Sequence, residues 1–77
     1  MKKIHILGTG CPKCKKMYEV AQEAVKAASI EAEVTKVEDI NDILSFGVMM
    51  TPALVIDGEV KIVGRVPRVD ELTTFLQ

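Results

Sequence analysis

The chain has 77 residues, of which 48% are hydrophobic and 27% are charged. This length allows one small domain, and the composition is too apolar for a disordered chain, so we expect a single folded domain over residues 1–77. Ten basic and eleven acidic residues leave a net charge of −1, which gives no strong field to attract nucleic acid or an anionic membrane. We expect a monomer, with neither nucleic acid nor a membrane among its partners.

The N-terminal segment predicts a short strand and then a sharp turn. Ile4, Ile6 and Leu7 supply the apolar residues of the strand, and Gly8-Thr9-Gly10 gives the backbone freedom that such a turn needs. The segment lacks the long apolar stretch of a signal peptide. The longest strongly apolar run of the chain, Ala53–Ile56, is far below the roughly 20 residues that span a bilayer. We therefore expect a cytoplasmic location.

A helix and a second strand are predicted for residues 12–37. Pro12 fits the first helical position, because its missing N–H is no loss there. Residues 31–37 alternate in polarity, with Ala32 and Val34 on one face, as in a partly exposed strand that runs parallel to the first. The apolar residues of the helix recur at helical spacing, at Met17, Val20, Ala21, Ala24, Val25 and Ala28.

The next segment predicts a short helix over residues 39–46. Its apolar residues Ile40, Ile43 and Leu44 are expected to face inward, and an acidic residue lies near its start. Gly47 is expected to end the helix.

The last third of the chain predicts a hairpin and a final helix. Strands over residues 53–56 and 59–63 flank Asp57-Gly58, a two-residue hairpin turn. Residues 67–76 carry apolar side chains at helical spacing. The predicted order is β-α-β-α-β-β-α, an α/β fold with a four-stranded mixed sheet and helices on both faces.

The motif Cys11-Pro12-Lys13-Cys14 contains both cysteines of the chain, at the point where the first strand gives way to the helix. A thiol at a helix N-terminus faces unsatisfied backbone N–H groups, which stabilise the thiolate and lower its pKa. Lys13 and Lys15 add positive charge nearby. Cys14 lies one turn further on the same face, within reach of a disulfide. We expect Cys11 to be the nucleophile and Cys14 the resolving cysteine of a reversible Cys11–Cys14 disulfide.

Two other roles for the cysteine pair stay open. A structural disulfide that closes a four-residue loop would contribute only about 2 kcal/mol, and a persistent disulfide is disfavoured in a reducing compartment. Two thiolates also suit Cu(I) or Zn(II), although with His5 as the one imidazole they cannot complete a closed four-ligand zinc site within a monomer. A soft-metal binding or carrier protein is therefore the alternative function.

Over essentially its whole length the chain resembles the thioredoxin and glutaredoxin superfamily, most closely small members that lack the N-terminal strand and helix of full thioredoxins. The resemblance rests on the cysteine motif after the first strand and on Thr51-Pro52 before the hairpin. It implies a cis Thr51–Pro52 bond beside the disulfide, with the Thr51 backbone binding an extended substrate. Gly64 resembles the glycine that leaves room for the substrate backbone. Met50, beside the proline, belongs either to an apolar rim for partners or to the core.

The chain also departs from the family pattern. Gly10 stands where thioredoxins usually have tryptophan, and the residues that bind glutathione in glutaredoxins are absent near the last helix. His5 lies six residues before Cys11, where many thioredoxins have a buried acid. Its imidazole is either a base for Cys14 or a side chain that fills the other face of the strand.

Together these observations predict a dithiol–disulfide oxidoreductase that reduces protein disulfides and needs no bound cofactor and no metal. Its expected partners are disulfide-containing proteins and an upstream reductase of the thioredoxin-reductase kind. A non-enzymatic interaction module is a third possibility, and its binding would survive the loss of Cys11.

Overall fold

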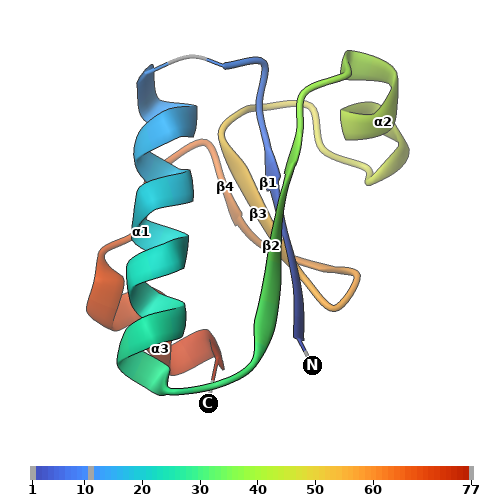
Figure 1. Cartoon of the computed structure of the whole chain (residues 1–77). Coiled ribbons are helices and arrows are strands. Elements are labelled where there is room, and N and C mark those ends of the chain that lie inside the picture. Colours follow the sequence, from blue (N-terminus) through green and yellow to red (C-terminus); the bar gives the residue numbers. More distant parts are fainter. Residues whose placement is uncertain (1, 11, 77) are drawn as a thin grey trace.

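The computed structural model describes residues 2–10 and 12–76 (Figure 1). The described elements follow the predicted order, and the predicted α/β fold is confirmed. In chain order they are β1 (Lys2–Leu7), α1 (Pro12–Ala28), β2 (Ala32–Val37), α2 (Ile40–Ser45), β3 (Ala53–Ile56), β4 (Glu59–Val63) and α3 (Val69–Leu76).

The four strands form one mixed sheet in the order β2-β1-β3-β4. β1 runs parallel to β2 and antiparallel to β3, and β3 runs antiparallel to β4. The register pairs Leu7 with Val37 and with Ala53, and it pairs Ala53 with Val63. Since these residues stand at strand ends, the segments that follow β1, β2 and β4 and the segment that precedes β3 all meet at one edge of the sheet.

The core lies on both faces of the sheet. On one face Ile4 and Ile6 of β1 pack with Leu54 and Ile56 of β3 against α1 and α3. On the other face Leu7, Ala53 and Val55 pack against Ile43 of α2. Because alternate residues of a strand point to opposite faces, this arrangement explains why all four residues of β3 are apolar and buried.

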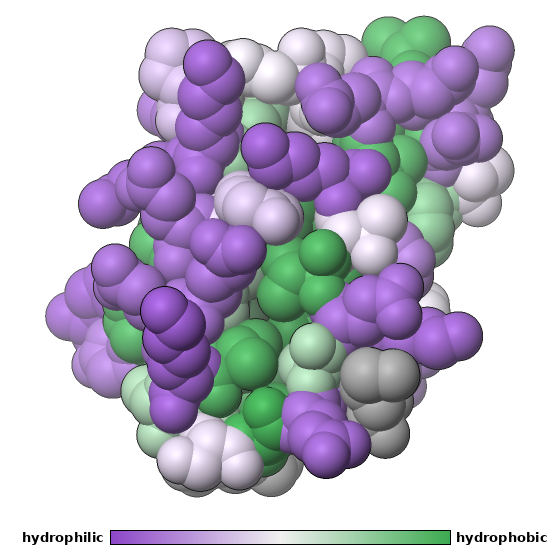
Figure 2. All heavy atoms as spheres, in the orientation of Figure 1, coloured by the Kyte–Doolittle hydropathy of each residue, from purple (hydrophilic) through white to green (hydrophobic). Residues whose placement is uncertain are grey.

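The outer strand β2 is only half covered. Ala32 and Val34 share one face, as predicted, and are partly buried against the core that includes α1, whereas Glu33 and Thr35 are exposed. Figure 2 shows apolar side chains at the floor of the hollow between α1 and β2. Within the described residues, no helix is both long and apolar enough to cross a bilayer.

The prediction for α2 was only partly right. Ile43 is 3% exposed, but Ile40 is 62% exposed and Leu44 is 52% exposed, so two of the three residues expected inward face outward. A helix of six residues makes fewer than two turns, and Ile43 is its one buried residue. Its N-terminus is fixed instead by Asp39, whose carboxylate accepts hydrogen bonds from the N–H groups of the first turn.

The hairpin turn joins β3 to β4 and also contacts the N-terminal strand. Asp57 and Gly58 both have positive φ, 51° and 85°, as a two-residue hairpin turn of the primed type requires. The Asp57 N–H donates to the Lys3 carbonyl at 2.8 Å. In return the Lys3 N–H donates to Asp57 Oδ1 at 3.0 Å, and the Lys2 ammonium lies 3.6 Å from Oδ2. The bond from the Lys3 N–H, followed by the Lys2 charge, holds the pKa of Asp57 below its usual value.

We expect Asp57→Asn to lower stability at neutral pH and to flatten the loss of stability in acid. The folded-state pKa of Asp57 lies below the unfolded-state pKa. Its contribution is therefore present above the unfolded-state pKa and is lost as the pH falls through the folded-state pKa. Asparagine tolerates the positive φ, so the backbone is preserved. The measurement is the urea midpoint of both proteins from neutral to acidic pH, where the difference between them should shrink.

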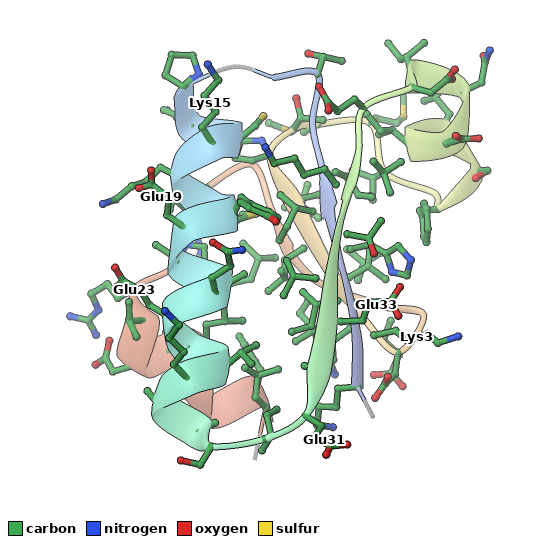
Figure 3. All side chains as sticks on the ribbon, viewed as in Figure 1. Lys3, Lys15, Glu19, Glu23, Glu31 and Glu33 are labelled. Carbon is green, nitrogen blue, oxygen red and sulfur yellow. The ribbon has the colours of Figure 1, made fainter. Side chains whose placement is uncertain are left out.

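The control for that comparison is Glu23→Gln, which makes the same charge change at an exposed position on α1 (Figure 3). If the stabilities of Asp57→Asn and Glu23→Gln follow the same pH dependence, the contacts of the Asp57 carboxylate with Lys2 and Lys3 do not contribute to the pH dependence of stability.

Candidate active site

Cys14 lies in the first turn of α1 and is 5% exposed. Its sulfur packs against the backbone of Gly8, at the end of β1. A Cβ built on Gly8 would lie 2.2 Å from Cys14 Sγ and 2.8 Å from Cys14 Cβ. The Gly8 N–H donates to the Val37 carbonyl at 3.0 Å, which extends the β1–β2 ladder by one residue. The close approach of helix and strand therefore depends on the absence of a side chain at position 8.

The turn after β1 leads into the cysteine motif. Gly10 has a φ of 93°, which L side chains rarely adopt, so its glycine suits the sharp turn predicted there. Pro12 and Lys13 begin α1 and are both exposed. The predicted nucleophile, Cys11, lies outside the described residues.

A small pocket of about 60 Å³ opens beside Cys14. Lys15 of α1 lines it with Lys36 of β2 and with Glu38, which follows β2. The Glu38 carboxylate also lies close to Gly10, because a Cβ built there would be 3.5 Å from Oε2. The remaining lining residues are Ile6, Gly8, Gly10 and Cys14. The pocket therefore sets charged groups of both signs beside a buried thiol.

Thr51 and Pro52, here called the proline segment, lie at the same edge of the sheet. The Thr51–Pro52 peptide bond is cis, as the family resemblance implied. Pro52 is buried and Thr51 is exposed. Since Ala53 pairs with Leu7, Pro52 and Gly8 are the next residues outward from this pair, one on each strand. The proline segment thus lies at the same strand ends as Gly8, whose backbone packs against the Cys14 sulfur.

Gly64 contacts the proline segment through a backbone hydrogen bond, and it lies close to the Met50 side chain. Its N–H donates to the Pro52 carbonyl at 2.8 Å, and its φ of 79° suits glycine. A Cβ built on Gly64 would lie 3.3 Å from Met50 Cε. Met49 is 90% exposed and Met50 is 62% exposed, so these apolar side chains lie on the surface and are not part of the core.

His5 lies on the other face of the sheet. Its ring centroid is 5.4 Å from that of Phe46, and Leu7, two residues further along β1, belongs to the cluster under α2. Cys14 instead packs from α1, on the face that carries Ile4 and Ile6. The sheet therefore separates the imidazole from the thiol, which favours the packing role of His5 over a role as base.

Sequence reasoning missed Gly8, Lys36 and Tyr18. The Lys36 ammonium lies 4.5 Å from the centroid of the Tyr18 ring. The alternation that places Ala32 and Val34 toward α1 extends to Lys36 and could have indicated it. No sequence pattern indicates that Gly8 lies too close to Cys14 to carry a side chain, because this contact joins two different elements of the fold.

The residues at this edge define a class of protein: a thioredoxin-like α/β protein with a buried cysteine in the first turn of a helix and a cis proline at the same edge of the sheet. A family model described as a thioredoxin domain matches residues 2–77. A thioredoxin of Methanothermobacter thermautotrophicus is 43% identical over 76 residues, which cover 99% of each chain. A thioredoxin of Methanocaldococcus jannaschii is 42% identical over 74 residues, 96% of this chain and 85% of that one. The chain belongs to the thioredoxin family, and it is a dithiol–disulfide oxidoreductase.

Proposed function

We propose that this protein reduces disulfide bonds in other proteins, with Cys11 as the nucleophile and Cys14 as the resolving cysteine. The observation that carries the proposal is the packing of the Cys14 sulfur against Gly8, at the sheet edge that also holds Pro52 and Gly64. A resolving thiol must be held in place while it waits for the mixed disulfide to form. Burial in the first turn of α1 provides that position.

The proposed reaction has two exchange steps. The Cys11 thiolate attacks one sulfur of the substrate disulfide, so that a Cys11–substrate disulfide forms and the other substrate sulfur leaves as a thiolate. The Cys14 thiolate then attacks the Cys11 sulfur, forms the Cys11–Cys14 disulfide and releases the second substrate thiolate. Both substrate thiolates take up protons according to their pKa. The substrate gains two electrons, and the protein loses two.

The substrate would bind as an extended peptide along the proline segment. Thr51 is exposed and precedes a buried proline, so its backbone can hydrogen-bond to a peptide laid beside it. Gly64 has no side chain to obstruct that peptide, and the exposed Met50 offers a deformable apolar contact. Main-chain bonds of this kind accept many sequences, which suits a reductase of diverse proteins.

The oxidised protein needs an electron donor to complete the cycle. We propose an upstream reductase of the thioredoxin-reductase kind and a cytoplasmic location, because a reductant of protein disulfides works where thiols are kept reduced. The dithiol itself carries the electrons, so the proposal includes no bound cofactor. The glutaredoxin residues that bind glutathione are absent near the last helix, which favours a protein reductase over glutathione as the electron donor.

The test is reduction of insulin disulfides with dithiothreitol as the electron source. We expect Cys11→Ser to lower the rate by about 100-fold or more, because serine is a far weaker nucleophile than a thiolate. Cys14→Ser should still attack but should accumulate a covalent mixed disulfide, visible by non-reducing electrophoresis and mass spectrometry. Ala27→Ser, at an exposed position of α1, is the matched control and should keep full activity.

Two results would contradict the proposal. Cys11→Ser could retain the activity of the wild type, or the wild type could fail to reduce insulin while binding one equivalent of Cu(I). The second result would establish the soft-metal carrier.

A further inference from the structure

The Met50 side chain lies over Gly64, at the edge of the sheet that holds the proline segment. A Cβ built on Gly64 would lie 3.3 Å from Met50 Cε and 4.0 Å from Met50 Sδ. The Met50 thioether therefore covers the place that a side chain at position 64 would take. Gly64 is in turn bonded to the proline segment, because its N–H donates to the Pro52 carbonyl at 2.8 Å. The thioether thus belongs to the surface to which we assign peptide binding.

Met50 is also open to small solutes. The residue is 62% exposed and its neighbour Met49 is 90% exposed, whereas Met17 in the core is 0% exposed. Peroxides convert methionine to methionine sulfoxide, which turns an apolar side chain into a polar one. Because reaction requires contact between the sulfur and the oxidant, we expect hydrogen peroxide to oxidise Met49 and Met50 and to spare Met17.

We propose that Met50 is a site of reversible oxidation and that its sulfoxide weakens the binding of protein substrates. The inference rests on the proposed function, in which an extended peptide lies along the proline segment. In the forward step the Met50 sulfur gives two electrons to a peroxide: an S–O bond forms, the O–O bond breaks and water leaves. In the reverse step a methionine sulfoxide reductase passes two electrons and two protons from a dithiol, so that the oxygen leaves as water and the dithiol becomes a disulfide.

The sulfoxide oxygen replaces an apolar contact with a strong hydrogen-bond acceptor. The Gly64 N–H is already paired with the Pro52 carbonyl, so that donor is not available to the oxygen. A peptide that covers Met50 would remove the oxygen from water, and a polar group that loses water without gaining a partner costs free energy. Oxidation of Met50 leaves both cysteines chemically unchanged. We therefore expect weaker peptide binding with unchanged thiol–disulfide exchange.

Met49 provides a comparison within the same loop. It is the more exposed of the two methionines, so it should be oxidised at least as readily as Met50. The atoms that would meet a Cβ at position 64 belong to Met50. Oxidation of Met49 alone should therefore leave peptide binding intact.

The test starts from the protein with the Cys11–Cys14 disulfide formed, so that neither thiol is free to react with peroxide. After treatment with hydrogen peroxide, mass spectrometry of the peptides should find one added oxygen on Met49 and on Met50 and none on Met17. The disulfide is then reduced with dithiothreitol, the dithiothreitol is removed, and the second-order rate constant of dithiol oxidation is measured. We expect the constant for insulin to fall by about 3- to 10-fold, and the constant for the small disulfide dithiobis(nitrobenzoic acid) to stay the same.

Three variants assign the effect to one sulfur. Met50→Leu has no sulfur at this position, so peroxide should not change its rate constant for insulin, whatever value the untreated variant has. Met49→Leu is the matched control, and peroxide should slow it as much as the wild type. Met50→Gln carries a polar group without oxidation and should react slowly with insulin before treatment. Incubation of the treated wild type with the two stereospecific methionine sulfoxide reductases should restore its rate.

Three results would overturn the inference: peroxide slows Met50→Leu as much as the wild type, both disulfides are reduced more slowly to the same degree, or Met50 gains no oxygen under conditions that oxidise Met49. Failure of the untreated wild type to reduce insulin would instead overturn the proposed function. The two failures are distinguishable, because the oxygen on Met50 is located by mass spectrometry without any turnover.

Discussion

Gly8→Ala should destabilise the fold by about 1–3 kcal/mol, the usual cost of overpacking, and should remove most of the reductase activity. The added Cβ would lie 2.2 Å from Cys14 Sγ and 2.8 Å from Cys14 Cβ. The second of these atoms is fixed to the helix backbone, so rotation of the cysteine side chain cannot relieve the contact. The first turn of α1 must move away from β1, and Cys14 moves with it.

The measurement combines thermal unfolding under reducing conditions with insulin reduction. For a domain of this size each kcal/mol lowers the melting temperature by about 4–8 °C. Gly58→Ala is the matched control: it adds the same methyl group at a φ of 85° with nothing within 4 Å. That variant should lose about 1 kcal/mol through backbone strain and keep its activity. If the two alanine variants lose equal activity, Gly8 has no special relation to Cys14.

Leu72→Ala should destabilise the protein by about 2–5 kcal/mol, because it leaves a cavity in the core. Leu72 is fully buried and, with Leu76, fixes the eight-residue helix α3 against the rest of the core cluster. Small domains are stable by only about 5–15 kcal/mol in total, so this one change removes a large share.

The control for Leu72→Ala is Leu44→Ala, which deletes the same atoms from the outward side of α2. Leu44 is 52% exposed, so we expect a change of less than about 1 kcal/mol in the free energy of unfolding. Urea unfolding of the reduced proteins measures both. Equal losses in the two variants would mean that α2 packs through Leu44 after all.

Most of the fold could be predicted because several local signals agreed. The apolar residues of α1 define one buried stripe, and Met17, Val20, Ala21 and Ala24 are indeed buried. The alternation of polarity in residues 32–37 predicted β2, and the turn at Asp57-Gly58 predicted the hairpin of β3 and β4. Patterns of this kind extend over several turns or over paired strands, so one misread residue does not change the outcome.

The prediction failed where the pattern was short or where the cause lay in three dimensions. Ile40, Ile43 and Leu44 span little more than one helical turn, and their spacing did not decide which of them the sheet would cover. Gly8 read as part of a flexible turn, yet its role is to leave space for a sulfur from another element. The possible role of His5 as a base rested on its spacing of six residues from Cys11. The alternation of side chains along β1 instead places His5 on the face of the sheet opposite to α1.

The two faces of the sheet are covered to very different extents. One carries α1 and α3 over the larger cluster, while among the buried residues of α2 only Ile43 contacts the sheet (Figure 1). Local opening needs the least free energy where the fewest apolar contacts must break. Amide protons of residues 40–50 should therefore exchange with solvent sooner than those of α1. Thr51, to which we assign peptide binding, adjoins this more easily opened segment, whereas Cys14 belongs to the better-packed α1. On the proposed function, the peptide-binding segment can therefore adapt to varied targets without moving the resolving cysteine.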